Sequence, residues 1–400
     1  MSAALIAAGH ISAPLAEADV AIVNTCTVTS EADHKTRKAI RRASRECAGQ
    51  VIATGCATAI DPDALEGLGE NVIVEPNRQL AIEKALAALE REAKLAAQAP
   101  SAHPRAAEGF HTRMGIKVQD GCNNRCAFCI VNRARGKSVS MPLESVVSEV
   151  ALASESGIAE VVLTGINIGS YREVADSGWI LKLPQLIEAL LERTGIGRIR
   201  LSSIEPPDVD DELIALLERY RGRFCAHLHM PLQSGCDRTL AAMGRLYDTA
   251  DFARRVEAIY AVRPDASITT DVIAGFPQET DSDFAQTLEF CRRMRFSKIH
   301  AFRYSVRPGT PAAEMEGQID PRIKAQRASS LHILSDELRC DDMLRRVGSR
   351  ELVVVETGRI GMSESYHEVV VKGEMPRRGE MLELEFTGIE ENARLIGKRV

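Results

Sequence analysis

The sequence predicts an α/β protein built from three successive parts: an incomplete flavodoxin-like parallel sheet, an open six-stranded (β/α)6 barrel and a small all-β OB-like barrel. Three observations lead to this prediction. Apolar strand patterns alternate with helical patterns up to residue 98, and six further strand–helix repeats follow from Met114. From Val347 onward, short strand patterns separated by glycines replace the helices. Strands that alternate with helices indicate a parallel sheet covered by helices on both faces.

The predicted domain borders follow these changes of pattern. We assign residues 1–98 to an N-terminal domain, 99–112 to a linker, 113–346 to the barrel and 347–400 to the C-terminal domain. The linker has two prolines, many small residues and no hydrophobic periodicity, which is typical of a connecting segment.

Length and composition are ordinary for a globular protein, with 400 residues, 26% charged and 45% hydrophobic. No apolar run reaches the roughly 18 residues that span a bilayer, and the first nine residues lack a charged start and a cleavage site. We therefore expect a cytoplasmic protein without a membrane partner. A net charge of −6 gives no reason to expect DNA binding, so any nucleic-acid contact must come from local patches. Ten cysteines in a reducing compartment favour metal or redox chemistry over disulfides.

Two cysteines of the N-terminal domain each follow a strand. The predicted elements are strands at 19–24, 50–54 and 72–74 and helices at 30–47 and 78–98. Cys26 and Cys56 come just after the first and second strands, where open α/β sheets place their ligands. We predict that they share a site, the alternative being two unrelated buried cysteines.

On the first helix, Lys38, Arg41 and Arg45 share a face, which is either a solvated surface or a phosphate-contacting one.

The barrel strands are expected at 116–119, 160–164, 198–202, 227–231, 267–274 and 298–304. Each is followed by a polar or glycine-containing motif, on the loop-bearing face where barrel enzymes build their sites.

In the C-terminal domain, strands are expected at 351–356, 366–372, 381–386 and 394–396, with turns around Gly361, Gly373, Gly379 and Gly388. OB-like barrels commonly bind oligonucleotides, but only Arg377-Arg378 and Lys398-Arg399 form basic spots here.

Cys122, Cys126 and Cys129 follow the first barrel strand with C-x3-C-x2-C spacing. Structural zinc sites use four ligands, whereas three thiolates suit a [4Fe–4S] cluster with one open iron. Such an iron can chelate S-adenosylmethionine (SAM) and pass it an electron. The alternative is three buried structural cysteines. The other cysteines have no ligand-like spacing and are expected to be buried as small hydrophobes: Cys47, Cys225, Cys236, Cys291 and Cys340.

With Phe128 just before its last cysteine, this motif resembles that of the radical SAM superfamily. More narrowly, the chain resembles a methylthiotransferase from Met1 to Val400, and its last part resembles the TRAM domain that these enzymes use to hold RNA. The narrower resemblance rests on the motifs at 24–29, 54–56, 163–167, 202–206, 231–235 and 275–280.

The resemblance implies a set of cofactor contacts at the strand ends. Thr164-Gly165 would present backbone groups to SAM, and Ser203 and Glu205 would bond its ribose or amino group. Each could instead be a plain turn or helix cap. The remaining predicted pocket residues are Gln233, Asp271 and Gly275. Arg133, Arg135 and Lys137 could hold the cofactor carboxylate, approach a substrate phosphate or face water.

The resemblance also implies two iron–sulfur clusters. The triad cluster would cleave SAM, and an auxiliary [4Fe–4S] cluster at Cys26 and Cys56 would supply sulfur, with a flavodoxin or ferredoxin as electron donor. In relatives a third auxiliary cysteine lies one strand and one helix before the Asn24–Cys26 motif, so we expect it upstream of Met1. A misplaced start codon explains its absence more simply than a natural two-cysteine site, and the present form should hold the auxiliary cluster weakly.

The motifs Ile166–Gly169 and Ser203–Pro206 look most like the branch that acts on N6-threonylcarbamoyladenosine, on the 3′ side of the anticodon in the tRNA anticodon stem-loop. The isopentenyladenosine branch, a branch that modifies a ribosomal-protein aspartate, and a non-catalytic RNA-binding iron–sulfur protein remain as alternatives.

Overall fold

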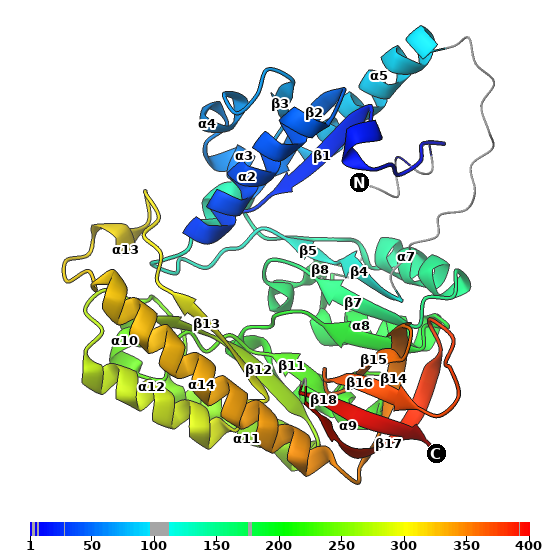
Figure 1. The fold of residues 1–400 in the computed structure, drawn as a ribbon. Helices are drawn as coiled ribbons and strands as arrows, with labels where there is room; N and C mark the ends of the chain where they lie inside the picture. Colours follow the sequence, from blue (N-terminus) through cyan, green and yellow to red (C-terminus); the bar gives the residue numbers. More distant parts are fainter. Residues whose placement is uncertain (2–4, 6–7, 28, 97–111, 175–177, 392) are drawn as a thin grey trace. The chain divides into compact units, whose positions relative to one another are not determined.

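The computed structural model describes residues 1, 5, 8–27, 29–96, 112–174, 178–391 and 393–400. The predicted fold class is confirmed: parallel α/β sheets are followed by a closed five-stranded β-barrel (Figure 1). The described chain forms two compact units. Unit 1 contains the residues up to Ala96 together with Phe128–Gly136 and Ser305–Ala313, and unit 2 contains the rest from Thr112. Most of the predicted linker lies outside the described residues. No helix in the described part of the chain is long and apolar enough to cross a membrane.

Unit 1 is built on a three-stranded parallel sheet in the order β1-β2-β3. Its strands are β1 (Val20–Thr25), β2 (Gln50–Gly55) and β3 (Val72–Val74). One face packs on α2, where Ile40 meets Ala53, and the other packs on α5, where Ala81 and Ala85 meet Ile52. This two-sided burial explains the unbroken apolar character of the strands. The helices are α2 (Ser30–Glu46), α3 (Cys56–Ile60), α4 (Asp63–Glu66), α5 (Arg78–Ala96) and α6 (Val131–Arg135), with a short η1 (Leu15–Glu17).

Unit 2 contains the six barrel strands in sequence order. A parallel sheet β10-β7-β4 and a parallel sheet β11-β12-β13 are joined by isolated parallel bridges from Ile199 to Phe224 and from Ser203 to His229. The strands are β4 (Arg113–Lys117), β7 (Glu160–Thr164), β10 (Arg198–Leu201), β11 (His227–His229), β12 (Ser267–Ala274) and β13 (Lys298–Arg303). β4 begins three residues earlier than expected, and β11 ends before Pro231 because proline cannot donate to a ladder.

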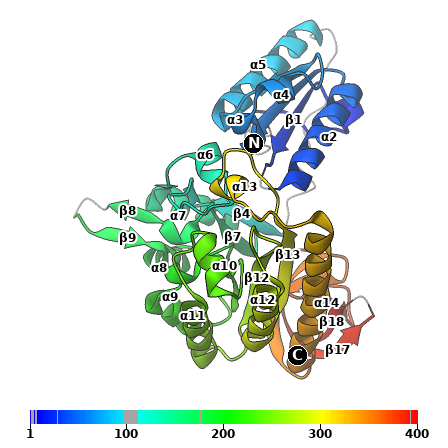
Figure 2. The same cartoon turned by 90° about the vertical axis from the view of Figure 1, so that its left-hand side faces the viewer.

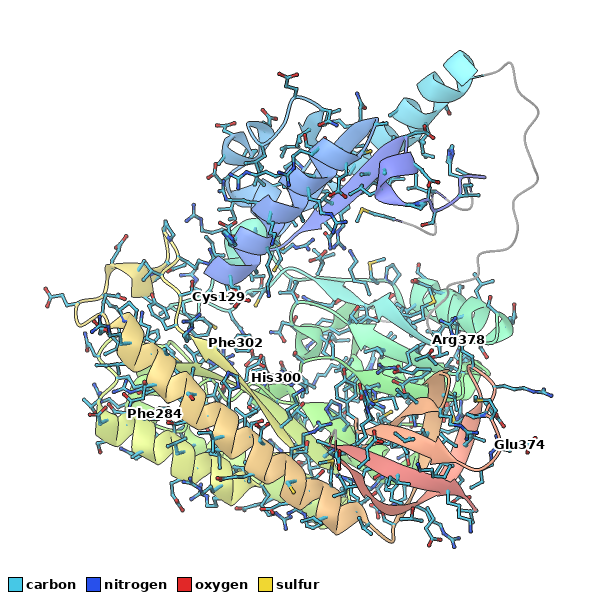
Figure 3. The ribbon with its side chains drawn as sticks, in the orientation of Figure 1. Cys129, Phe284, His300, Phe302, Glu374 and Arg378 are labelled. Carbon is cyan, nitrogen blue, oxygen red and sulfur yellow. The ribbon has the colours of Figure 1, made fainter. Side chains whose placement is uncertain are left out.

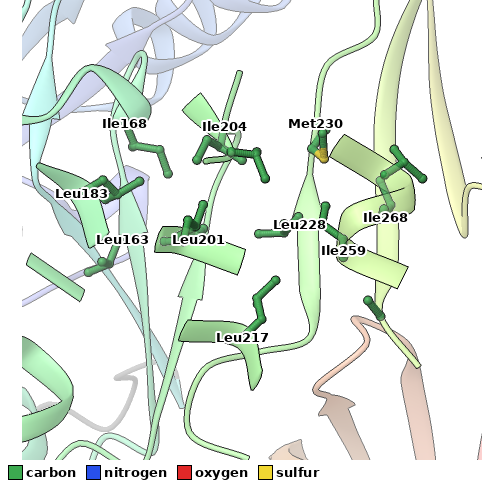
Figure 4. Packing of buried hydrophobic residues seen from close by; sticks show 14 of the residues in the cluster. Leu163, Ile168, Leu183, Leu201, Ile204, Leu217, Leu228, Met230, Ile259 and Ile268 are labelled. Atoms are coloured by element: carbon green, nitrogen blue, oxygen red, sulfur yellow. The ribbon is translucent and has the colours of Figure 1, made fainter. Parts of the chain in front are cut away.

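Helices cover the outer face of this barrel (Figure 2). Leu163 of β7, Leu201 of β10 and Leu228 of β11 belong to one continuous apolar core with Leu183 and Leu217 of the covering helices (Figure 4). The helices are α7 (Leu143–Glu155), α8 (Leu183–Arg193), α9 (Asp211–Arg219), α10 (Asp237–Ala242), α11 (Thr249–Val262), α12 (Asp281–Met294), α13 (Pro311–Glu314) and α14 (Pro321–Arg346).

Four short strands pair outside the barrel sheets. β5 (Gln119–Asp120) pairs with β6 (Val139–Ser140), and β8 (Arg172–Val174) pairs with β9 (Ile180–Lys182). Two 3-10 turns, η2 (Ile168–Ser170) and η3 (Pro206–Asp208), follow β7 and β10. The sequence analysis did not foresee these pairs, since two- or three-residue strands carry no readable periodicity.

The C-terminal barrel closes in the order β14-β15-β16-β18-β17. Its strands are β14 (Arg350–Thr357), β15 (Ile360–Ser363), β16 (Glu368–Lys372), β17 (Met381–Glu390) and β18 (Arg394–Arg399). Two predicted turns are wrong, because Gly361 lies within β15 and Gly388 lies at a bulge within β17. A Cβ on Gly361 would lie 2.6 Å from Val353 Cγ1, so this glycine permits close strand packing rather than a turn.

A buried ion cluster joins this barrel to the parallel sheet. Arg198 and Arg200 of β10 both bind Glu160 of β7, with Nε–O distances of 2.6 and 2.8 Å. Arg198 also donates to the carbonyls of Leu352 and Met362, and Arg200 donates to those of Ser363 and Glu364. Because these carbonyls belong to the C-terminal barrel and the loop that follows β15, the two arginines fix its position on β7 and β10.

The cysteines without ligand spacing follow the expectation with one exception. Cys47, Cys225, Cys236 and Cys291 are buried, whereas Cys340 of α14 is exposed. The prediction for Cys340 is therefore wrong, because it lies on the solvent side of a long helix that packs through its opposite face.

Candidate active site

The cysteine motif lies in a loop after β5, and its part up to Ala127 belongs to unit 2. Gly121 adopts a φ of +72° at its start, a conformation that favours glycine. Near its middle, the backbone N–H of Ala127 donates to the carbonyl of Met243 at 2.9 Å. The thiols of Cys122 and Cys126 are both partly buried. Cys129 is also partly buried, as is Phe128, and both fall in the short stretch that belongs to unit 1.

Each cysteine sulfur accepts an N–H donor. Asn124 N lies 3.4 Å from Cys122 Sγ, and Val131 N lies 3.4 Å from Cys129 Sγ. Arg245 Nη1 donates to Cys126 Sγ at 3.0 Å. Hydrogen bonds to sulfur tune and stabilise cysteine ligands of iron–sulfur clusters. Burial, the strongest influence, raises the pKa of Cys126, while Arg245 opposes that change.

Gln119 ties the cysteine loop to the loop after β7. This buried side chain donates from Nε2 to the carbonyl of Gly121 at 2.7 Å and accepts from the N–H of Asn167 at 2.9 Å. A Cβ on Gly165 would lie 2.9 Å from Gln119 Oε1. The predicted Thr164-Gly165 turn is therefore held against the cysteine loop, with Thr164 Oγ1 donating to Ile116 O.

Arg245 is the central side chain of the site, and the sequence analysis missed it. Its guanidinium pairs with the carboxylate of Glu205 and bonds the thiol of Cys126 and the hydroxyl of Tyr247. Burial alone would lower the pKa of Arg245, but Tyr247, Glu205 and Cys126 raise it. Burial raises the pKa of Glu205 despite the arginine beside it. Arg245 follows a short helix rather than a strand, so the rule that placed the other residues could not find it.

The other predicted contacts lie on the second half of the barrel. Gln233 has a φ of +67°, an unusual conformation for a residue with a side chain, and its N–H donates to the carbonyl of Asp271 at 2.8 Å. Asp271 Oδ1 lies 3.3 Å from His229 Nε2. Asp271 also contributes, as the smallest named influence, to the raised pKa of Glu205.

Two aromatic residues of β13, His300 and Phe302, lie on the strand next to Asp271. His300 is paired in register with Asp271, and its ring meets that of His229 edge-on at 5.6 Å between centroids. Phe302 lies two residues further along the same strand and is exposed (Figure 3). Strand neighbours two apart share a face, so His300 and Phe302 form an aromatic strip that the sequence analysis did not identify.

Two predicted residues have plainer surroundings. Ser203 is exposed and forms a parallel bridge with His229. Gly275 has a φ of +75°, and a Cβ there would lie 2.4 Å from Lys324 Cγ. Its N–H donates to Glu279 Oε2 at 2.8 Å. Gly275 is therefore needed for a tight turn and for close packing of α14, whatever its relation to a cofactor.

Cys26 and Cys56 stand at equivalent places in the sheet of unit 1. Thr25 of β1 and Gly55 of β2 are register partners, so each cysteine is the next residue after a paired position. Gly55 has a φ of +115°, and a Cβ there would lie 2.5 Å from Thr25 O. Cys26 is exposed, whereas Cys56 is buried and accepts a hydrogen bond from Arg135 Nε at 3.1 Å. Arg135 is thus placed beside a thiol, which none of its three sequence interpretations anticipated.

The sulfur atoms of the three cysteines suit iron better than a harder metal such as magnesium or calcium. Within the described ranges, no three His, Cys, Asp or Glu side chains converge tightly enough to hold a single metal ion. The triad nevertheless offers soft thiols with N–H donors to every sulfur and, at Cys126, a buried guanidinium. Thiolate ligands with these neighbours fit a [4Fe–4S] cluster.

Comparison with known proteins agrees with this chemistry. Residues 116–291 match the radical SAM superfamily, and residues 1–74 match the Uncharacterized protein family UPF0004. The chain is 35% identical over 381 residues to the threonylcarbamoyladenosine tRNA methylthiotransferase MtaB of Thermotoga maritima, which covers 94% of this chain and 87% of that protein. It is 33% identical over 380 residues to the tRNA-2-methylthio-N(6)-dimethylallyladenosine synthase of Mycobacteroides abscessus, with 90% and 74% covered.

A solved structure shares the fold. The radical S-adenosylmethionine methyltransferase TsrM from Kitasatospora setae, with cobalamin and a [4Fe–4S] cluster bound, superposes with a TM-score of 0.56 at 16% identity. The superposition covers 75% of this chain and 67% of TsrM. At this identity the likeness concerns the fold alone.

Proposed function

The chain belongs to the radical SAM methylthiotransferase family, and from this premise we propose that it converts N6-threonylcarbamoyladenosine, beside the tRNA anticodon, to its 2-methylthio derivative. The observation that carries the proposal is the position of Arg245, which bonds both the thiol of Cys126 and the carboxylate of Glu205. This residue connects the cysteine loop to Glu205 and the other polar groups at the strand ends of the barrel, where the cofactor and the base would meet in this proposal.

Cys122, Cys126 and Cys129 would hold a [4Fe–4S] cluster. When bound, such a cluster with an open iron supplies one-electron cleavage of SAM, which gives access to an unreactive C–H bond. The protein's part is to position the reactants and to exclude water. Gln119 fixes the loop, Gly165 allows close backbone approach, and Glu205, Gln233 and Asp271 provide polar groups on the facing strands.

The second cluster is proposed at Cys26 and Cys56. Their equivalent positions after register partners in adjacent strands support a shared site, and Arg135 supplies a donor to one sulfur. A family ligand set would need a third cysteine besides these two. We further propose that a flavodoxin or ferredoxin supplies the electrons.

The threonylcarbamoyl substrate is favoured over the dimethylallyl one by motif rather than by overall identity. MtaB proteins at 35% identity and dimethylallyladenosine synthases at 33–35% are almost equally similar to this chain. The residues after β7 and β10, Ile166–Gly169 and Ser203–Pro206, favour the MtaB branch. The exposed Phe302 and half-buried His300 offer stacking surfaces for a base.

Two measurements test the function. Reconstituted, dithionite-reduced protein should form 5′-deoxyadenosine from SAM, Cys126→Ala should abolish it, and Cys340→Ala should not affect it. Mass spectrometry of tRNA nucleosides from a deletion strain should show loss of 2-methylthio-N6-threonylcarbamoyladenosine and its return on complementation. Loss of the 2-methylthio-isopentenyl derivative instead would assign the chain to the other branch, and cleavage that persists without Cys126 would reject the cluster assignment.

A further inference from the structure

A cavity lies within unit 1. It has a volume of about 510 Å³ and lies between α2, α3, the segment at Ile130–Arg133 and the segment at Arg307–Gly309. All of its lining residues belong to unit 1. Thr27 and Ala57, the residues that follow Cys26 and Cys56, belong to its lining, so the cavity adjoins the proposed auxiliary cluster. No role has been assigned above to Arg307, which lines the same cavity.

Arg307 is the residue that points to a ligand. Its side chain lines the cavity and is only 8% exposed. Among the described residues, neither its Nε nor its Nη2 has a hydrogen-bond partner. Buried guanidinium donors without partners are costly, so a protein keeps such a group when a ligand completes its bonds. A guanidinium fork matches two oxygens of a phosphate or carboxylate.

The charges around the cavity leave one positive charge uncompensated. Three arginines line it, with two aspartates, Asp33 and Asp61. Arg37 is engaged with both acids, at 3.5 Å from Asp33 and 4.0 Å from Asp61. Arg133 donates to the carbonyl of Gly309 at 3.3 Å. Asp33 also acts electrostatically on Arg307, but it is shared with Arg37. Three arginines against two aspartates leave one excess positive charge in the lining, which a singly charged anion would balance.

The volume of the cavity and the polarity of its lining indicate which class of anion it would bind. A cavity of this volume is several times larger than a phosphate ion needs, and part of its wall is apolar, formed by Ile60, Leu65 and Pro308. A phosphodiester carries one negative charge and is flanked by largely apolar sugar carbons. Backbone phosphates are the groups that proteins contact to fix the register of a nucleic acid.

We propose that this cavity, the Arg307 pocket, binds one phosphate group of an RNA strand and so helps to set the position of the substrate. The inference rests on the proposed function, because that function makes an RNA the substrate. Arg307 provides the two-donor fork, Arg133 at the rim adds a second cation, and the Asp33–Arg37 pair shapes the wall. The exposed cations of α2, Lys38, Arg41 and Arg45, are not needed for this site.

The test measures binding of a fluorescent anticodon stem-loop RNA to the full chain over a range of salt concentrations. Arg307→Gln should weaken binding about tenfold and should reduce the slope of log K against log salt by about 0.7–0.9, the value for one lost phosphate contact. Arg42→Gln is the matched control, since Arg42 lies on the outer face of α2 and pairs with Glu46. It should leave both affinity and slope unchanged.

A second pair of variants covers the case in which Arg307→Gln does not fold. Ile60→Glu adds a negative charge to the wall of the pocket and should weaken RNA binding, whereas Ile60→Gln at the same position should not. Unchanged affinity and slope in both Arg307→Gln and Ile60→Glu would overturn the proposal. A loss of iron in Arg307→Gln with normal RNA binding would also overturn it, and would assign Arg307 as a countercharge to a cluster at Cys26.

The outcome also separates this inference from the proposed function. If the wild-type chain binds no RNA, the RNA substrate is wrong, and thermal stability is then compared in inorganic phosphate and in chloride at equal ionic strength. Stabilisation by phosphate that disappears in Arg307→Gln would retain the pocket as a phosphate site with a small-molecule source. No stabilisation would reject the pocket together with the function.

Discussion

Replacing Glu160 with Gln should destabilise the protein more than any other single change of charge in unit 2. The Glu160 side chain is fully buried and is contacted by two arginines that are also buried, Arg198 and Arg200. These arginines hold the C-terminal barrel through four backbone carbonyls. The glutamine keeps the shape of the side chain but removes the buried negative charge that both cations contact.

The magnitude follows from the pKa of Glu160. Burial alone would raise that pKa, but Arg200, Arg198 and Arg113 together lower it from 4.5 to about 2. At about 1.4 kcal/mol per pKa unit, this difference corresponds to roughly 3 kcal/mol of stability. Removing one partner of a buried ion pair typically costs about 3–5 kcal/mol, so we expect a loss of about 3–5 kcal/mol for Glu160→Gln.

Urea unfolding followed by far-ultraviolet circular dichroism measures this loss at neutral pH. Glu144→Gln is a matched control, because Glu144 pairs with Arg193 at 2.7 Å on the surface, where ion pairs contribute little. The midpoint urea concentration of its unfolding should equal that of the wild type. The pH gives a second readout: the folded-state pKa of Glu160 is depressed, so its contribution is present above about pH 4.5 and disappears as the pH falls towards 2. A loss below about 1 kcal/mol, or the same acid dependence in the variant, would refute the reasoning.

Three further changes test other parts of the structure. Gly361→Ala should cost about 1–3 kcal/mol, since its Cβ would lie 2.6 Å from Val353 Cγ1, and a thermal-melting curve equal to that of the wild type would contradict this. Arg245→Gln should reduce SAM binding and cleavage at least tenfold while the fold is retained; binding measured by calorimetry that stays unchanged would remove Arg245 from the site. Arg377→Gln combined with Lys398→Gln should lower the salt dependence of RNA binding without affecting uncoupled 5′-deoxyadenosine formation, and an unchanged slope would show that these two residues do not contact the phosphates.

The order of the elements and the gathering of three thiols in one loop could be predicted from the sequence. Apolar strands that alternate with helices leave few topologies open, because parallel strands must be joined by right-handed crossovers. The strands at 160–164 and 267–274 were predicted with the bounds that the structure has. Three cysteines within eight residues must share one loop whatever the tertiary structure, because their spacing is local.

Tertiary structure alone decided which distant side chains meet at the site. Arg245 reaches Cys126 across 119 positions of the chain, and Glu160 meets Arg198 across 38. Such pairs form only when helices and strands pack together. The hydrophobic periodicity of each element shows which of its faces is buried, but not which side chains of another element it will contact. Glycines show the same limit: at Gly361 the local sequence suggests a turn, whereas the closeness of Val353 and Val354 in the paired strand β14 explains why no side chain fits there.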